Sequence, residues 1–390
     1  TGIGVKDKSR MLLLLLKYNI SAVIMAALFH ILIYAAVGRL NGGIDMIKAA
    51  VLGATGYAGI ELVRLLTNHP EVSIEIVGSH SFAGKKIDEV YPNFRHILEK
   101  ECTELNLEEV AKCDIAFTAL PHGASKCVIP SILEQGVKVI DLSGDYRYDD
   151  VKVYEKWYGQ EHSSPELLKE SVYGLPELHR EEIKKARLIG NPGCYTTCSI
   201  LGAAPLLASG AGETKNIIVD AKSGVTGAGR GLSQQVHFCE CAETAKAYKV
   251  ATHRHTSEIE QELSHIAGEE IMLSFTPHLI PVKRGILSTI YINLKRNYTT
   301  EELTEIYKDY YKDEFFIRVY DAGKLPEIKN VAGSNFVDIG VVADERLQRA
   351  VVVSSIDNIV KGAAGQAVQN MNLLFGLDEK TALASAGFYL

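Results

Sequence analysis

A glycine-rich turn between a buried strand and a helix limits the possible folds of this chain more than any other feature of its sequence. Residues 48–52 are apolar enough for a buried strand, and Gly53-Ala54-Thr55-Gly56-Tyr57-Ala58-Gly59 follows directly. Apolar residues with helical spacing then run from 60 to 67. Small residues let the backbone approach a pyrophosphate, whose charge faces the free N–H groups of the helix start. The pattern predicts a dinucleotide-binding βαβ unit, and the alternative is a tight turn that binds no ligand.

The remainder of the chain alternates β-rich runs with helical patterns, as a parallel α/β sheet requires. Further buried strands are predicted over residues 72–78, 115–119 and 137–142. Beyond residue 194 a helix over 196–207 precedes strands with few helical crossovers, over 216–222, 271–277, 287–294, 315–320, 337–342 and 350–355. The sequence therefore predicts an α/β fold with a Rossmann-type doubly wound parallel sheet, joined to an α+β substrate and dimerisation domain with a mainly antiparallel sheet.

Four segments follow from this pattern: an apolar leader (1–45), a nucleotide-binding domain (46–193), a catalytic and oligomerisation domain (194–357) and a C-terminal segment (358–390) whose helix over 358–375 returns to the first domain. In the leader, three basic residues precede a nearly unbroken apolar run from Met11 to Val37, which is long enough for a signal-anchor. We favour the alternative that Met46 is the true start, because the globular pattern begins abruptly there. We therefore expect a cytoplasmic location.

Charge and cysteine usage narrow the class of protein. The formal net charge of -7 gives no basic surplus, which disfavours nucleic acid as a main partner. The chain has seven cysteines, an odd number scattered over a long sequence, which does not resemble a disulfide framework and fits a reducing compartment. Cys239 and Cys241 form a lone C-x-C without a partner cluster, so we predict no metal site.

The end of the second strand indicates which dinucleotide is bound. An NAD binder usually carries an acidic residue there for the ribose 2′-hydroxyl. Here the strand ends in Gly78-Ser79-His80-Ser81, and Lys85 and Lys86 follow. Hydroxyl groups and nearby cations hold a 2′-phosphate that an acid would repel. We therefore predict NADP rather than NAD, with Ser79 and Ser81 among the contacts.

A cysteine follows Asn191-Pro192-Gly193 and begins a helical pattern. The free N–H groups and the dipole of a helix start lower the pKa of a thiol, and they stabilise an oxyanion on an attacked carbonyl. This position makes Cys194 a candidate for an ionised nucleophile, although a cysteine at a helix start is, taken alone, inert more often than not. Cys198, one turn later, is expected to serve packing alone.

From residue 46 to the C-terminus the sequence resembles the N-acetyl-gamma-glutamyl-phosphate reductases, which serve arginine biosynthesis and are related to aspartate-semialdehyde dehydrogenase. The resemblance rests on motifs in one order, namely the turn 53–59, Leu120-Pro121-His122-Gly123, Asp141-Leu142-Ser143-Gly144-Asp145-Tyr146-Arg147, Asn191-Pro192-Gly193-Cys194-Tyr195, the stretch Ser223–Arg230, His253-Arg254-His255, the stretch Pro277–Pro281 and the stretch Lys361–Gln366. One departure is Thr196, where many members have proline, and both residues suit a first helical turn.

The resemblance implies that Cys194 is the nucleophile and that a histidine is the acid/base. We expect His253 in that role with His255 beside it, because both rings of an extended H-x-H point to one face. His278 is the alternative. Arg147, Arg230 and Arg284, with His255, suit the substrate carboxylate and phosphate, although a single arginine is as often merely solvated. The remaining candidates, for the cofactor, are Pro121, Ser223, Gly224, Gly227 and Gln366.

The resemblance further implies a reaction. The thiolate attacks the acyl phosphate of N-acetyl-gamma-glutamyl phosphate, phosphate leaves, and hydride from NADPH converts the thioester to N-acetylglutamate semialdehyde. The partners expected are this small substrate, NADP(H) and further copies of the chain in a dimer or tetramer. An aminoadipate- or aspartate-type acyl phosphate is the alternative substrate. A non-catalytic NADP-binding sensor is the alternative from another class, and the complete Cys and His set argues against it.

Overall fold

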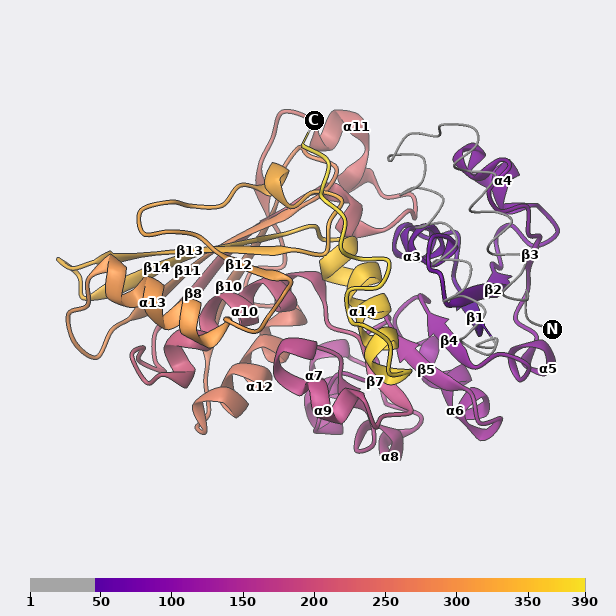
Figure 1. Cartoon of the computed structure of the whole chain (residues 1–390), viewed down its shortest axis with the longest axis horizontal. Coiled ribbons are helices and arrows are strands. Elements are labelled where there is room, and N and C mark those ends of the chain that lie inside the picture. Colours follow the sequence, from indigo (N-terminus) through magenta and orange to yellow (C-terminus); the bar gives the residue numbers. More distant parts are fainter. Residues whose placement is uncertain (1–45, 390) are drawn as a thin grey trace, which may run out of the picture. The chain divides into compact units, whose positions relative to one another are not determined.

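A computed structural model describes residues 46–389, so the apolar leader lies outside the described residues. Two seven-stranded sheets organise the described chain (Figure 1). Among the described residues no helix combines the length and the apolar character needed to cross a membrane.

The first sheet is parallel throughout, as predicted. Its order is β3-β2-β1-β4-β5-β7-β6, and each neighbouring pair is parallel. The strands are β1 (Ile47–Leu52), β2 (Val72–Gly78), β3 (Cys102–Thr103), β4 (Ile115–Thr118), β5 (Lys138–Asp141), β6 (Val172–Tyr173) and β7 (Leu188–Gly190). Because the strand order reverses between β1 and β4, the crevice for a ligand lies at the carboxyl ends of these strands.

Helices connect these strands. The longer ones are α3 (Tyr57–Thr67), α6 (Ser125–Glu134), α7 (Val151–Tyr158) and α9 (Pro176–Ile183). The short ones are α4 (Ile87–Val90), α5 (Leu107–Val110) and α8 (Pro165–Leu168). Helix α3 begins directly after Gly56, three residues before the predicted start at residue 60, so the glycine turn leads into the helix without a linker.

The second sheet is mixed and mainly antiparallel, which confirms the prediction. Its order is β12-β13-β14-β11-β8-β10-β9, with parallel pairs at β12–β13 and β8–β10 and antiparallel pairs elsewhere. The strands are β8 (Ile217–Ser223), β9 (Lys246–Ala247), β10 (Leu273–Leu279), β11 (Ile286–Asn293), β12 (Ile317–Val319), β13 (Val337–Asp344) and β14 (Arg349–Ile356). Strand β12 is shorter than the predicted 315–320.

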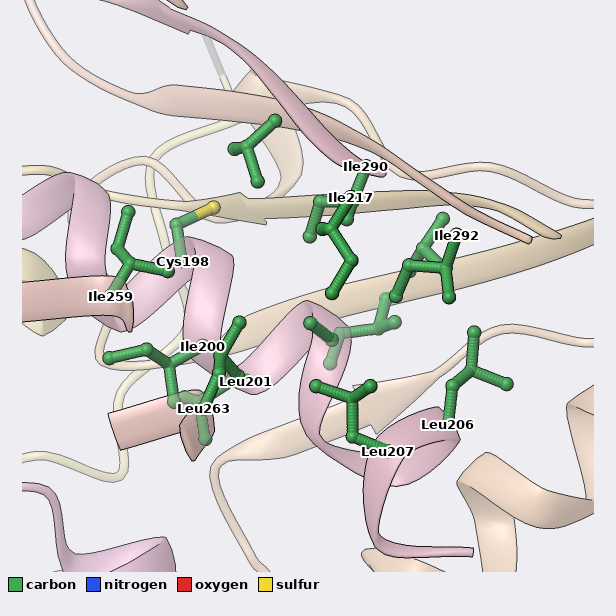
Figure 2. Packing of buried hydrophobic residues seen from close by; sticks show 14 of the residues in the cluster. Cys198, Ile200, Leu201, Leu206, Leu207, Ile217, Ile259, Leu263, Ile290 and Ile292 are labelled. Atoms are coloured by element: carbon green, nitrogen blue, oxygen red, sulfur yellow. The ribbon is translucent and has the colours of Figure 1, made fainter. Parts of the chain in front are cut away.

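One face of this sheet is covered by α10 (Cys194–Ala208), α12 (His255–Ala267) and α13 (Thr300–Tyr310). Every residue of α10 from Tyr195 to Leu207 is buried, because the helix lies between α12 and strands β11 and β14. Figure 2 shows its apolar side chains against those of α12 and the sheet. Cys198 is part of this core and contacts the carbonyl of Ser354, which confirms its packing role.

The C-terminal helix differs from the single helix predicted over 358–375. It opens with a π-helical turn, η5 (Val360–Ala364), and continues as α14 (Gly365–Leu374). Val360, Ala364 and Val368 lie in the same hydrophobic core as strand β1, and α14 returns beside β5 (Figure 1). A π-turn re-aims the backbone, and such turns are frequent at functional sites.

Candidate active site

The predicted motifs gather along one edge of the first sheet. The glycine turn follows β1, the Leu120–Gly123 loop follows β4, the Leu142–Arg147 loop follows β5 and the Asn191–Cys194 loop follows β7. Because these strands are parallel, their carboxyl ends share an edge. From β1 to β7 there are three strand spacings, or about 14 Å. A dinucleotide bound at the turn extends along this edge toward Cys194.

The glycine turn forms a cradle that larger residues would fill. Gly53 has a φ of +85°, and a Cβ there would overlap the carbonyl oxygen of Ala119 at the end of β4. A Cβ at Gly59 would overlap the carbonyl oxygen of Gly53. Gly56 caps α3 without a side-chain hydrogen bond, so the first N–H groups of the helix have no side-chain partner there. This geometry fits a bound pyrophosphate.

Hydroxyl groups line the adenosine end of the turn. The Thr55 and Ser79 hydroxyl oxygens are 2.7 Å apart, and Ser79 is buried at the end of β2. Ser81 is exposed two residues later, while Lys86 contacts Glu99 at 3.6 Å. Pro121 lies in the exposed loop after β4. The residues present therefore fit a dinucleotide, and residues 78–81 at the end of β2 include no acid.

Cys194 is the first residue of α10, but the expectation of an ionised thiol is wrong for this structure. Burial raises the pKa of the Cys194 thiol to about 11, although the backbone amides of Tyr195 and Cys194 and the charge of Arg147 lower it. Part of that burial comes from η5, since a Cβ at Gly362 would lie 2.8 Å from the Cβ of Cys194. At neutral pH the thiol keeps its proton, so attack requires a base.

Two imidazoles lie beside this cysteine. The ring centroids of His253 and His255 are 4.7 Å apart, and a Cβ at Gly193 would overlap Nε2 of His255. The expected extended H-x-H is wrong, because Arg254 has helical angles and His255 begins α12. The rings meet because the His255 N–H donates to Nδ1 of His253, at 3.2 Å.

Both imidazoles are neutral at pH 7. Burial lowers the pKa of His253 to about 3, helped by the charges of Lys249 and Arg254. Burial likewise holds the pKa of His255 well below its usual value, helped by His253 and Arg147. A lowered pKa leaves each ring free to accept a proton but makes it a weaker base, so the pKa values do not separate the two rings. Their positions do, because His255 is the one that lies against the backbone at Gly193. The structure therefore favours His255 over His253 as the base.

Glu258, which the sequence analysis missed, organises the turn that carries the nucleophile. Its Oε1 accepts hydrogen bonds from the Gly193 N–H (2.9 Å), the Thr196 hydroxyl (2.9 Å) and the Tyr173 hydroxyl (2.8 Å). Its Oε2 accepts from Arg147 at 3.2 Å. Glu258 follows His255 by one helical turn, and that spacing was the signal available.

The three arginines assigned to substrate anions have other partners. Arg147 is 6% exposed and is held by Glu258 and the carbonyl of Leu142. Arg284 donates to Glu61 at 2.7 Å and lies 3.6 Å from Asp357. Arg230 lies at the glycine turn and donates to the carbonyl of Thr55. These contacts do not support direct substrate binding by Arg147 or Arg284.

A different arginine has no acidic partner among residues 46–389. The guanidinium of Arg254 lies 4.7 Å from the ring centroid of Tyr158, and the ring of His122 packs edge-on to the same tyrosine at 5.7 Å. The hydroxyl of Tyr158 lies against Gly144, which is also next to Arg147. The half-buried guanidinium of Arg254 and the exposed ring of His122 therefore lie on one tyrosine next to the histidine pair.

The remaining predicted residues lie around the same edge or behind it. Ser223 ends β8, Gly224 packs against the backbone of Lys283, and Gly227 lies near Asn358. Gln366 is fully buried and donates to the carbonyl of Gly174, which does not support a direct cofactor contact. His278 contacts Asp220 at 3.1 Å, and that carboxylate rather than Cys194 is its partner.

A cavity of about 970 Å³ lies away from these groups. It is lined by α7, α12 and the edges of β8 and β10, including Trp157, Ile218 and Met272. None of the predicted catalytic residues lines it.

Comparisons with known proteins agree on one family. The family model for the semialdehyde dehydrogenase NAD-binding domain matches residues 48–186, and that for the semialdehyde dehydrogenase dimerisation domain matches residues 194–358. N-acetyl-gamma-glutamyl-phosphate reductase of Acetivibrio thermocellus is 60% identical over 346 residues, covering 88% of this chain and 100% of that protein. The protein of that name from Symbiobacterium thermophilum is 53% identical over 342 residues, covering 87% of this chain and 98% of its own length.

Solved structures show the same fold at lower identity. Aspartate semialdehyde dehydrogenase II of Vibrio cholerae is 20% identical with a TM-score of 0.66, and the match covers 85% of this chain and 98% of that chain. The Candida albicans aspartate semialdehyde dehydrogenase solved with NADP is 20% identical with a TM-score of 0.63, with the same coverage. The chain therefore belongs to the N-acetyl-gamma-glutamyl-phosphate reductase family of oxidoreductases, which is built on the semialdehyde dehydrogenase fold.

Proposed function

We propose that Cys194 carries the reductive dephosphorylation of N-acetyl-gamma-glutamyl phosphate to N-acetylglutamate semialdehyde and phosphate, with His255 as its base. The observation that supports this most is the placement of a neutral imidazole against the turn that precedes a protonated thiol. A non-catalytic sensor has no use for such a pair. We retain the domain bounds 46–193 and 194–357, with 358–390 returning to the first domain.

The cofactor is NADP(H), which the chain's own nucleotide-binding domain holds. The cradle of Gly53, Gly56 and Gly59 accepts the pyrophosphate, and Thr55 and Ser79 supply hydroxyls at the adenosine end. Tyr57, Ala58, Ser81, Pro121, Ser223, Gly224 and Gly227 stay proposed contacts. Bound NADPH supplies a hydride to the thioester carbon.

The chain's residues move the protons and hold the acyl group. His255 takes the thiol proton as the sulfur of Cys194 bonds to the acyl carbon, and the C–O bond to phosphate breaks. The imidazolium then protonates the departing phosphate. After reduction the thiohemiacetal on Cys194 collapses to the aldehyde, its C–S bond breaks, and a solvent proton restores the thiol through His255.

The substrate anions need cations that are not already paired. Arg254 stacks on Tyr158 and has no acidic partner among residues 46–389. His122 packs on the same tyrosine but is neutral at pH 7, because burial and the charge of Arg254 lower its pKa to about 4. We assign the acyl phosphate or carboxylate of the substrate to Arg254, because a guanidinium binds such groups with two parallel hydrogen bonds. Arg147 supports the site from behind through Glu258.

We further propose that the chain forms a homo-oligomer in the cytoplasm. The face of the second sheet that α10 does not cover presents Ile218, Leu287 and Tyr291, which are half-buried or exposed in one copy. Asp220, Lys222 and Thr289 alternate onto the same face, so it is mixed in character. A mixed sheet face of this kind suits an isologous contact between two copies. A cytoplasmic location fits seven cysteines that are all free.

A phosphate-dependent assay tests the proposed reaction. Run in reverse, the protein should reduce NADP+ with N-acetylglutamate semialdehyde and phosphate, and the rate should vanish without phosphate. Aspartate semialdehyde and aminoadipate semialdehyde are the controls, and a higher kcat/KM with either of them would replace the proposed substrate. Absence of turnover with all three, while NADP+ still binds, would favour the sensor.

A further inference from the structure

One arginine of the second half of the chain contacts the glycine turn of the first. Arg230 follows the short helix η2 (Val225–Ala228), and one terminal nitrogen, Nη1, donates to the carbonyl of Thr55 (3.1 Å) and to the hydroxyl of Tyr91 (2.8 Å). Its guanidinium lies over two aromatic rings, 4.9 Å from the centroid of Phe82 and 4.7 Å from that of Tyr91. The group is therefore fixed in orientation before any ligand binds.

The place that Arg230 reaches is the adenosine end of the turn. The Thr55 hydroxyl contacts Ser79, the first residue after β2, where a bound dinucleotide puts its ribose 2′ oxygen. Phe82, one of the stacked rings, is three residues further along. The arginine and the 2′ position thus share the same neighbours.

The guanidinium has donors left for a ligand. Nε and Nη2 of Arg230 have no hydrogen-bond partner among residues 46–389, and no carboxylate of that range pairs with it. The competing cations, Lys85 and Lys86, make no side-chain contact with Thr55 or Ser79 there, and Lys86 faces Glu99. A stacked guanidinium with free donors on one edge suits a phosphate monoester, which it binds with parallel hydrogen bonds.

We propose that Arg230 binds the 2′-phosphate of NADP(H) and sets the preference for NADP over NAD, with Phe82 and Tyr91 holding its guanidinium flat. This replaces its sequence-based assignment to the substrate. It rests on the nucleotide assignment and not on the identity of the acyl phosphate, so its test uses no acyl substrate. It also means that the loop after β8 helps to close the nucleotide site.

Calorimetric titration of the full chain with NADP+, NAD+ and 2′,5′-ADP tests the proposal. Arg230→Gln should weaken NADP+ and 2′,5′-ADP by about 10- to 100-fold, the loss expected for hydrogen bonds to a charged group. Affinity for NAD+ should change by less than about twofold, because NAD+ has no group for these donors. Lys85→Gln is the matched control and should leave all three affinities unchanged.

Two outcomes would overturn the proposal. Equal weakening of NADP+ and NAD+ by Arg230→Gln would mean that the arginine only supports the shape of the turn. The proposal would also fail if Lys85→Gln lost the preference for NADP+ while Arg230→Gln kept it. The lysines would then be the residues that bind the 2′-phosphate. Phe82→Ala keeps the charge and removes one stacked ring, so it should give a smaller loss, about threefold to tenfold, confined to NADP+ and 2′,5′-ADP. A loss shared by NAD+ there would contradict the stacking role.

Discussion

The two ends of the carboxyl edge of the first sheet are built in different ways. At the glycine turn, Gly53 and Gly59 shape the backbone and few side chains intervene, so the ligand meets main-chain N–H groups. At the other end, Cys194 is enclosed by η5 and α12, and its turn is tied to a buried carboxylate, Glu258. The first end is specified by shape, whereas the second is specified by burial and charge. The two ends should therefore respond differently to substitution.

Cys194→Ser should have the largest effect on kcat. It should abolish the chemistry at the thiol end and leave nucleotide binding at the glycine turn unchanged. The substitution should lower kcat by about 10³-fold or more, because the serine hydroxyl is a far weaker nucleophile than the cysteine thiol at this position. NADP+ binding by calorimetry should stay within about twofold, since the turn is untouched. Cys127→Ser, at an exposed cysteine, is the control and should keep full activity. Substantial turnover in Cys194→Ser would exclude the covalent route.

The two histidines provide the next largest effect. His255→Asn should lower kcat by about 10²- to 10⁴-fold, the contribution of a positioned base, because within residues 46–389 it is the ring of His255 that lies against Gly193. His253→Asn should cost less, since that ring acts on His255 and not on the backbone at Gly193. Steady-state rates of both variants, with thermal melts to confirm folding, measure the difference. The opposite order would return the role to His253, as the sequence suggested.

Glu258→Ala tests the buried network at the thiol end. Removing one partner of the Arg147–Glu258 pair, whose side chains are 5% and 0% exposed, should cost about 3–5 kcal/mol of unfolding free energy. The control is Glu170→Ala, whose partner Arg187 is exposed, and that change should cost less than about 1 kcal/mol. Urea unfolding of both variants measures the costs. Equal costs would mean that the Glu258 network adds nothing to stability.

Alkylation of Cys194 by iodoacetamide tests the raised pKa directly. Only the thiolate reacts, so a pKa of about 11 in place of 9.0 reduces the rate at pH 7 by about 100-fold. The rate in the free protein should keep rising above pH 9. Since the native state holds the extra proton, stability should fall as pH rises from 9 toward 11. A rate that reaches its plateau below pH 8 would support the sequence-based prediction that Cys194 is ionised at neutral pH.

The parts of this molecule that could be predicted are those that depend on residues close together in the sequence. The parallel sheet, the turn 53–59 and the mainly antiparallel second sheet follow from local periodicity and glycine placement, and the structure confirms them. The charge state of Cys194 could not be predicted, because the burial that raises its pKa comes from Gly362 and its neighbours, far along the chain. Glu258 was missed although its spacing from His255 was visible, because that spacing does not reveal its partners at Gly193, Thr196 and Tyr173. Its role exists only once α12 packs on α10.

A matched pair of glycines tests the shape-based end with the smallest expected effect. Gly53 and Gly84 have nearly the same φ, +85° and +83°, so alanine strains the backbone similarly at both, by about 1–2 kcal/mol. Their surroundings differ, since nothing lies within 4 Å of a Cβ at Gly84 while one at Gly53 overlaps Ala119. Gly53→Ala should therefore weaken NADP+ and NAD+ alike by roughly tenfold, about 1.4 kcal/mol, and Gly84→Ala should weaken neither. Calorimetry on both variants measures this, and a loss of NADP+ affinity alone would show that the turn reads the 2′-phosphate, a task that we assign to Arg230.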